Sequence, residues 1–180
     1  MKFEKTRLGG AWIVDINKLE DERGFFARTF CQTEFAEHGM NTHIAQCNVS
    51  YNKKKGTFRG MHLQVTPFQE AKLVQCTAGA IYDVIVDLRP ESSTYLKHIG
   101  ITLRAQEYRM LYIPEGFAHG FLTLEDDTNV FYQMSEFYAP ECARGFRWND
   151  PSFGITLPKE VEIISERDAN YPNYSMDLLR

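Results

Sequence analysis

The stretch Gly56–Gln64 reads Gly-Thr-Phe-Arg-Gly-Met-His-Leu-Gln. Successive side chains of a strand point to opposite faces, and the mixture of apolar and polar residues here predicts a β-strand. On a regular strand His62 would share a face with Phe58 and Gln64, whereas Arg59 would lie on the other face. A histidine in such a strand is either a packed core residue, which is the commoner case, or a base directed into a cavity. This stretch alone leaves both interpretations open.

Similar short runs follow one another at spacings of roughly ten residues with turn residues between them, which predicts an all-β sandwich or barrel. Residues 33–38 form the clearest helical pattern, with Thr33 at the expected N-cap and Gly39 after the end. A second short helix is expected around Ser165–Asn170. The expected strands are 11–16, 24–30, 43–50, 56–64, 71–77, 80–88, 98–103, 108–113, 120–123 and 128–137.

Composition narrows the class of protein. The chain has 180 residues, 43% of them hydrophobic, which suits one domain spanning residues 1–180 with a sizeable core. Lys and Arg number 20 against 24 Asp and Glu, for a formal net charge of −4. Lys53–Lys55 is the one basic cluster, so we expect no nucleic-acid partner. The N-terminus has no apolar signal core and no run is long enough to span a bilayer, so we expect a cytoplasmic protein without a membrane partner.

A metal site is not expected. The four cysteines are far apart and form no Cys-x-x-Cys pair, so zinc and redox motifs are absent and reduced thiols are expected. Metal-binding barrels of this kind often carry a His-x-His pair, a glutamate and a later histidine. Here the pair is His62-x-Gln64, the next acid is Glu70, and the later histidine is His119. Two histidines and a distant glutamate are a degraded ligand set.

Several polar residues have both a structural and a functional interpretation. In Tyr112–Phe121 a Pro-Glu-Gly turn precedes His119, which predicts a second histidine at the same end of a barrel. Tyr132 in an expected strand is by itself more typical of packing. Lys72 starts a strand, where it is either exposed or holds an anionic oxygen at the barrel mouth. Arg23 is either a surface charge or a group that grips phosphate.

These stretches belong to a longer collinear pattern that covers most of the chain. Its blocks are Asp21–Phe26, Phe58–Gln64, Lys72–Val74, Tyr82–Leu88, Ile113–Phe121, Tyr138–Glu141, Arg147–Pro151 and Ser165–Ala169. The pattern closely resembles that of the dTDP-4-dehydrorhamnose 3,5-epimerase family, the cupin-fold epimerases of nucleotide-linked 4-keto-6-deoxy sugars. The block that ends at Phe121 is long and specific.

The resemblance implies a cupin-type double-stranded β-helix, or jelly-roll barrel, with short peripheral helices. It also implies a homodimer with exchanged N-terminal strands, a nucleotide-diphosphate 4-keto sugar as substrate, and neither a metal nor another cofactor. The catalytic residues that it implies are His62 as base, Asp168 as the partner of that imidazole, Tyr132 as general acid and Lys72 as stabiliser of the enolate oxygen. For the diphosphate it implies Arg23 of the partner subunit, Arg59 and His119, and for the nucleotide base Gln46, Asn48 and Tyr138.

The chemistry of a 4-keto sugar is consistent with these roles. The ketone acidifies the hydrogens on C3 and C5, so each centre can invert through an enolate. A neutral histidine has an ordinary pKa of about 6.5 and can accept the proton, whereas a phenol with a pKa of about 10 stays protonated and can return one from the opposite face. A lysine in a water-poor cavity stabilises the negative enolate oxygen.

The chain departs from the family pattern at four positions near the expected nucleotide site. Arg28 stands where the family usually has a glutamate, Ala143 where it often has one, Cys47 replaces an aspartate and Arg167 replaces a lysine. Arg28 and Arg167 are kept as expected substrate-binding residues. The departures suggest the hypothesis of a GDP- or CDP-linked sugar in place of a dTDP-linked one. Two other functions stay open, namely a sugar-nucleotide 3,4-ketoisomerase and a non-catalytic cupin that binds sugar nucleotides.

Overall fold

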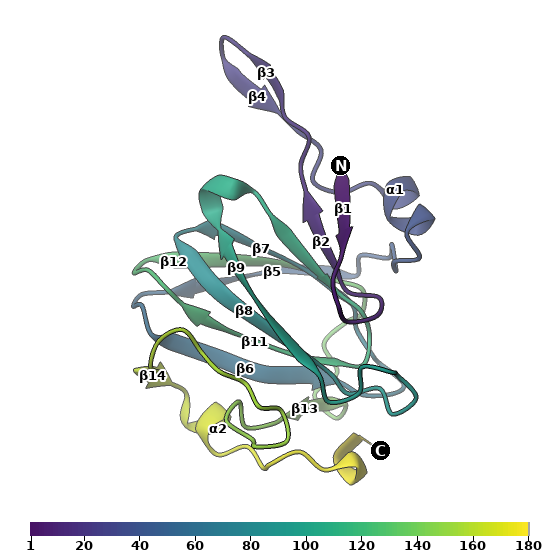
Figure 1. The fold of residues 1–180 in the computed structure, drawn as a ribbon, viewed down its shortest axis with the longest axis vertical. Coiled ribbons are helices and arrows are strands. Elements are labelled where there is room, and N and C mark those ends of the chain that lie inside the picture. The colour runs from purple at the N-terminus through teal and green to yellow at the C-terminus, as the bar shows by residue number, and fades with distance from the viewer. Residues whose placement is uncertain (180) are drawn as a thin grey trace.

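The computed structural model describes residues 1–179 and is built from two largely antiparallel sheets that face each other (Figure 1). The first sheet has the strand order β1 (Lys2–Lys5), β2 (Trp12–Asp15), β10 (Met110–Ile113), β7 (Lys72–Ala78), β12 (Thr128–Met134) and β5 (Gln46–Asn52). The second has the order β13 (Ala143–Gly145), β6 (Thr57–Gln64), β11 (Phe117–Thr123), β8 (Ala80–Asp87) and β9 (His98–Arg104), and β14 (Ile163–Ile164) pairs in parallel with β6.

The remaining elements are short. A hairpin of β3 (Leu19–Asp21) and β4 (Gly24–Phe26) forms a separate two-stranded sheet. The helices are α1 (Gln32–Glu37), α2 (Glu166–Ala169) and the 3₁₀ turns η1 (Ala105–Glu107) and η2 (Met176–Leu179). None of the helices within residues 1–179 is long and apolar enough to cross a bilayer.

Each expected strand has an observed counterpart, but some bounds were wrong. The strand expected at 24–30 ends at Phe26, because it belongs to a tight hairpin rather than to the barrel. β11 begins at Phe117, three residues before the expected start, and β12 ends at Met134. The first helix begins at Gln32 with Cys31 as its N-cap, so the predicted cap at Thr33 was wrong. Gly39 follows that helix with φ of +72°, as the helix-end signal predicts.

The space between the two sheets holds one apolar core. Ile81 and Ile85 on β8 pack there with Phe117 and Phe121 on β11 and with Val130 on β12. The two residues on β8 are four positions apart, as are the two on β11, so each pair shares the inward face of its strand. Burial of each such side chain stabilises the fold by about 1.5–3 kcal/mol. The core therefore fixes how the two sheets sit against each other.

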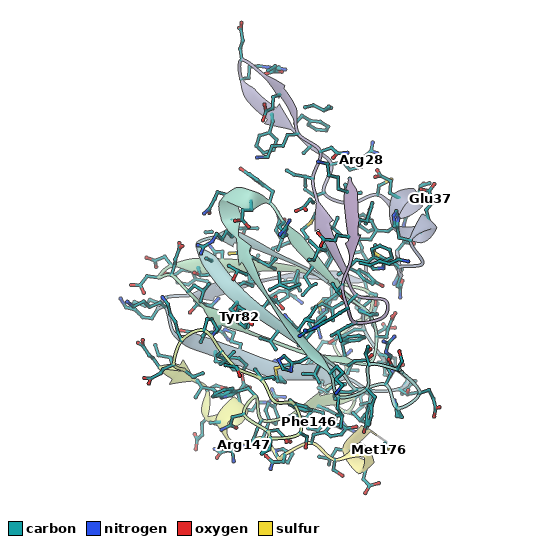
Figure 2. All side chains as sticks on the ribbon, viewed as in Figure 1. Arg28, Glu37, Tyr82, Phe146, Arg147 and Met176 are labelled. Carbon is teal, nitrogen blue, oxygen red and sulfur yellow. The ribbon has the colours of Figure 1, made fainter. Side chains whose placement is uncertain are left out.

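The C-terminal part of the chain covers the outer face of the second sheet. Phe58 and Met61 on β6 are buried there against Phe146 and Phe153. In Figure 1 the last part of this segment, which includes α2, runs in yellow below β6, and Figure 2 labels Phe146 in the earlier part. The packing anchors α2 beside β6, which brings residues from the end of the sequence next to the stretch Gly56–Gln64.

The N-terminal arm, residues 17–30, leaves the barrel. Figure 1 shows the β3–β4 hairpin extending away from the two sheets. Leu19 and Phe26 on this arm are largely exposed, and Phe25 contacts the ring of Tyr108. The arm thus presents apolar side chains that the rest of this chain does not cover.

Candidate active site

One end of the barrel interior is polar and contains a cavity of about 770 Å³. Side chains alternate along a strand, so Lys72 shares the inward face of β7 with the core residue Val74. In the same way Tyr132 shares the inward face of β12 with Val130. The inward faces are thus apolar at one end and polar at the other. Ligand cavities for small molecules are typically about 300–1,000 Å³, so this one can hold a substantial part of a nucleotide sugar.

A register shift in β6 determines which of its side chains face the cavity. His62 pairs with His119 of β11, but Arg59 pairs with Phe121, so β6 has one residue more than β11 between these two pairs. Such an extra residue interrupts the alternation of side chains. Arg59 and His62 therefore both line the cavity, while Phe58 lies in the outer core. The predicted shared face of His62 and Phe58 was wrong for this reason.

Glycine makes the shift possible. Gly60 has φ of +136°, and a Cβ built there would lie 2.4 Å from Cα of Gly120. Only glycine tolerates both the backbone angle and the close approach of the two strands. The N–H of Gly60 donates a hydrogen bond of 3.1 Å to Oδ2 of Asp168. The irregular part of β6 is thus tied to the residue that also contacts His62.

His62 and Asp168 form a pair at the wall of the cavity. Nε2 of His62 lies 2.9 Å from Oδ1 of Asp168, with the two side chains 43% and 7% exposed. Ser165 caps α2 by accepting the N–H of Asp168. Burial alone would raise the pKa of the Asp168 carboxyl, but hydrogen bonds from His62 and Gly60 hold it below its ordinary value. An ionised carboxylate only accepts, so Nε2 carries the hydrogen and Nδ1 is the basic nitrogen of His62.

Tyr132 reaches the cavity from the facing sheet, where it pairs with Asn48 of β5. Burial raises the pKa of the Tyr132 phenol well above its ordinary value, and the charge of Asp83 adds to the effect; Ser50 and Arg59 oppose it. The phenol therefore stays protonated at neutral pH. The structure thus has an imidazole on one sheet and a protonated phenol on the other, with one cavity between them.

Lys72 has a partner that the sequence did not identify. Nζ of Lys72 lies 2.7 Å from Oε1 of Glu70, and each side chain is 8% exposed. Glu70 was considered only as a metal ligand, and within residues 1–179 no three His, Cys, Asp or Glu side chains are grouped to hold a metal ion. A spacing of two residues in extended chain puts two side chains on one side, so this pair was open to prediction. Glu70 fixes the ammonium group inside the cavity.

A second histidine–aspartate pair lies deeper in the barrel. Nε2 of His119 is 2.9 Å from Oδ1 of Asp83, with the side chains 6% and 0% exposed. The distance is that of an ion pair, but its geometry is not that of a hydrogen bond, and neither carboxylate oxygen of Asp83 has a hydrogen-bond partner. The ring centroids of His119 and Tyr132 are 6.2 Å apart. The sequence predicts no role for Asp83, although an acid on an apolar strand is a visible signal.

Most of the expected substrate-binding residues lie together in the cavity. Tyr138 is exposed at its edge, and its N–H donates to Oε1 of Gln46 at 3.1 Å. Arg59 donates from Nε to Oδ1 of Asn52 at 2.7 Å, which fixes the guanidinium at the wall. The expected binding residues that line the cavity are Gln46, Asn48, Arg59, His119, Tyr138 and Arg167.

Tyr171 is a cavity residue that sequence reasoning missed. Its ring centroid lies 5.8 Å from that of His62, and the guanidinium of Arg167 lies 5.6 Å from the same ring. A Cβ on Gly145 would come within 2.1 Å of the tyrosine ring, so the ring lies directly on the backbone of β13. Since this contact depends on tertiary packing, the sequence carried no signal for it.

Arg23 and Arg28 lie outside the cavity of their own chain. Arg23 is at the hairpin turn of the N-terminal arm, where Nη2 contacts Oδ2 of Asp21 at 2.6 Å. Arg28 contacts Glu34 at 3.1 Å, and Figure 2 shows it at the base of the arm. Neither side chain reaches His62 within one chain.

Comparison with known proteins places this geometry in a family. A family model described as dTDP-4-dehydrorhamnose 3,5-epimerase matches residues 5–175. The chain belongs to this family. A dTDP-4-dehydrorhamnose 3,5-epimerase from Methanothermobacter thermautotrophicus is 43% identical over 94% of this chain and 92% of its own length.

Solved structures of family members agree with the fold. The epimerase from Bacillus anthracis, solved with TDP and pyrophosphate bound, is 39% identical with a TM-score of 0.91, over 96% of this chain and 99% of that one. A 3′-monoepimerase from Streptomyces bikiniensis in complex with dTDP-quinovose is 31% identical with a TM-score of 0.85, over 93% and 85%. The predicted all-β, cupin-type jelly-roll fold is confirmed.

Proposed function

We propose that this protein is an epimerase that inverts C3, C5 or both in a dTDP-linked 4-keto-6-deoxy sugar. The observation that carries the proposal is the placement of His62 and Tyr132 on facing sheets with Lys72 in the same cavity. Inversion of a carbon centre needs a base on one side of the sugar ring and an acid on the other. Family membership supports the same activity.

In the proposed mechanism His62 takes the proton next to the C4 ketone through Nδ1. The resulting imidazolium is stabilised by Asp168, which holds the ring through Nε2. The C–H electron pair becomes the enolate, whose oxygen is stabilised by Lys72. Glu70 keeps the ammonium group in position for that contact. Tyr132 then gives its phenolic proton to the opposite face of the same carbon, which completes the inversion.

We assign the nucleotide to the outer part of the cavity. Arg59 and Arg167 supply positive charge for the diphosphate, and a guanidinium suits bidentate contact with phosphate. His119 lines the same cavity at a deeper position, where it would meet the inner end of the diphosphate. Gln46 and Asn48 on β5 and the exposed ring of Tyr138 suit hydrogen bonding and stacking with the base. A family member has been solved with TDP bound. Within its own chain the Arg28 side chain contacts Glu34 outside the cavity, so Arg28, like Arg23, would approach a nucleotide only through an exchanged arm.

The N-terminal arm supports the proposal of a homodimer with exchanged strands. Leu19 and Phe26 are exposed on an arm that leaves its own barrel. Burial of such side chains against a second copy would be favourable, and Arg23 at the hairpin turn would then approach the partner's cavity. In solution the particle mass should be twice the 20.9 kDa of one chain, which light scattering measures.

Two alternatives use the same cavity. A 3,4-ketoisomerase would move the ketone rather than invert a centre, and a non-catalytic cupin would only bind the nucleotide sugar. The buried phenol of Tyr132 across the cavity from His62 favours inversion over both, because neither alternative needs an acid on the opposite face.

The test is proton exchange in D₂O with dTDP-4-keto-6-deoxyglucose, followed by NMR of the sugar. We expect deuterium at C3, at C5 or at both, and we expect the configuration of each labelled carbon to be inverted. Label at one centre defines a monoepimerase, and a ketone at C3 defines the ketoisomerase. Binding without label at either carbon would contradict the proposal. GDP- and CDP-linked forms of the same sugar serve as comparison substrates.

A further inference from the structure

Asp83 is an ionisable side chain that the proposed mechanism does not use. It lies on the inward face of β8 between the core residues Ile81 and Ile85, with no exposed surface. Its nearest polar contact is Nε2 of His119 at 2.9 Å, and both carboxylate oxygens lack a hydrogen bond. A buried carboxylate without a hydrogen-bond donor is strongly unfavourable, so an aspartate at this position costs stability and calls for a functional explanation.

Titratable groups approach Asp83 from three other strands. His119 comes from β11 and Tyr132 from β12, while Cys76 comes from β7. Burial raises the pKa of the Cys76 thiol to about 11, and the Asp83 carboxylate is among the smaller causes. The carboxylate thus acts on two side chains of the facing sheet, which places it in the centre of the barrel rather than at its edge.

Burial is the main reason why the Tyr132 phenol stays protonated, but positive charges in the cavity act in the opposite direction. Arg59 lowers the pKa of Tyr132, and the imidazolium that forms at His62 during the reaction adds positive charge in the same cavity. A phenolate cannot donate a proton to carbon. The negative charge of Asp83 opposes these cations.

We propose that Asp83 is a positioning residue for the proton-donating half of the reaction: through its pair with His119, it holds Tyr132 as a protonated phenol at the cavity wall. This inference rests on the proposed epimerase function. It assigns the two histidine–aspartate pairs to different halves of the reaction, with Asp168 serving removal of the proton and Asp83 serving its return.

The proton balance explains why such a residue is needed. Each inversion breaks one C–H bond and transfers that proton to His62, while the O–H bond of Tyr132 breaks and a new C–H bond forms. His62 then releases its proton to water and the phenolate takes one from water before another centre can invert. Asp83 increases the affinity of the phenolate for that proton and so restores the acid.

The test compares Asp83→Asn with the wild-type protein in the D₂O assay. Exchange reports proton removal by His62, and inversion reports donation by Tyr132. We expect the ratio of inversion to exchange to fall by about tenfold or more, since general acids contribute roughly 10²–10⁴-fold. The alkaline limb of the inversion rate should move to lower pH.

Asp87→Asn is the matched control. Asp87 is equally buried on β8, but its carboxylate accepts hydrogen bonds from Arg89, Ser92 and Thr94 and has no contact with His119 among those of the described residues. Asp87→Asn should lose stability, but the ratio of inversion to exchange and the alkaline limb of the inversion rate should not change. If Asp83→Asn only matches this control, the proposal is wrong. If Asp83→Asn does not fold, Asp83→Ser is used in its place, because it also removes the charge.

A spectroscopic measurement separates this inference from the proposed function. In protein labelled with 3-fluorotyrosine, the ¹⁹F signal that disappears in Tyr132→Phe reports ionisation of that one phenol without any substrate. We expect this signal to titrate at lower pH in Asp83→Asn than in the wild-type protein. An unchanged titration would overturn the role of Asp83 even if epimerase activity is found. A shifted titration in a protein without exchange or inversion would instead contradict the proposed function alone.

Discussion

The two histidine–aspartate pairs have nearly equal distances but very different surroundings. His62 and His119 are directly paired across β6 and β11, and each has a carboxylate oxygen 2.9 Å from Nε2. The His62 side chain is 43% exposed at the cavity wall, whereas that of His119 is 6% exposed. Asp168 accepts further hydrogen bonds and Asp83 accepts none.

The difference indicates which pair can exchange protons with its surroundings. A general base must accept a proton from the substrate and release it again, and both steps need access to the cavity or to water. The pair of His62 meets that condition. The pair of His119 does not meet it, because both side chains are buried away from solvent. The distance alone would not distinguish the two pairs, but burial and hydrogen-bond geometry do.

Removal of the exposed imidazole should have the largest effect. In His62→Ala we expect exchange and inversion to fall by about 10²–10⁴-fold at every centre, because the general base is lost. Deuterium incorporation measured by NMR checks this. His98→Ala is the control, since His98 contacts the backbone of Phe153 away from the cavity. Near-normal exchange in His62→Ala would show that the His62–Asp168 pair is not the one that removes the proton.

Removal of the phenol should have a smaller and more selective effect. In Tyr132→Phe we expect inversion to fall by about 10²–10³-fold, because the general acid is lost, while part of the exchange remains because His62 still forms the enolate. Product stereochemistry and deuterium content, measured in the same sample, give the two rates. If exchange and inversion fell equally in Tyr132→Phe, Tyr132 would not act as a separate acid from the base His62.

The smallest effect concerns stability. The Asp168 carboxyl has a lowered pKa in the folded protein, so its ionised form stabilises the fold above the ordinary aspartate pKa of about 3.9. That contribution is lost as the pH falls through the lowered value. Asp168→Asn should therefore lower the free energy of unfolding by about 1–2 kcal/mol at pH 7. The deficit should shrink below pH 4 in urea titrations, and a constant deficit would argue against the carboxylate as its cause.

The fold class could be predicted from the sequence because each strand has a local pattern of alternating and β-branched residues. The positions of Ile81, Ile85 and Val130 follow from alternation and from β-branched residues. The motifs also selected side chains that do meet in one cavity, such as Lys72 and Tyr132.

Other features depended on contacts that no local pattern encodes. The extra residue in β6 arises from the close approach of Gly60 to Gly120, which belongs to another strand. The roles of Asp83 and Tyr171 likewise depend on neighbours distant in sequence. Glu70 is the exception, since its spacing from Lys72 was enough to predict the pair.

The covering of β6 by the C-terminal segment has a consequence for heat and proteolysis. Asp168 is 106 positions from His62 in sequence, and it reaches the imidazole only while that segment stays docked on the outer core. Detachment of the segment leaves every inward strand of the barrel in place but strips the imidazole of its carboxylate. Mild warming or a single proteolytic cleavage near β14 should therefore abolish activity before the barrel unfolds. Loss of activity should then be a more sensitive measure of damage than loss of the fold.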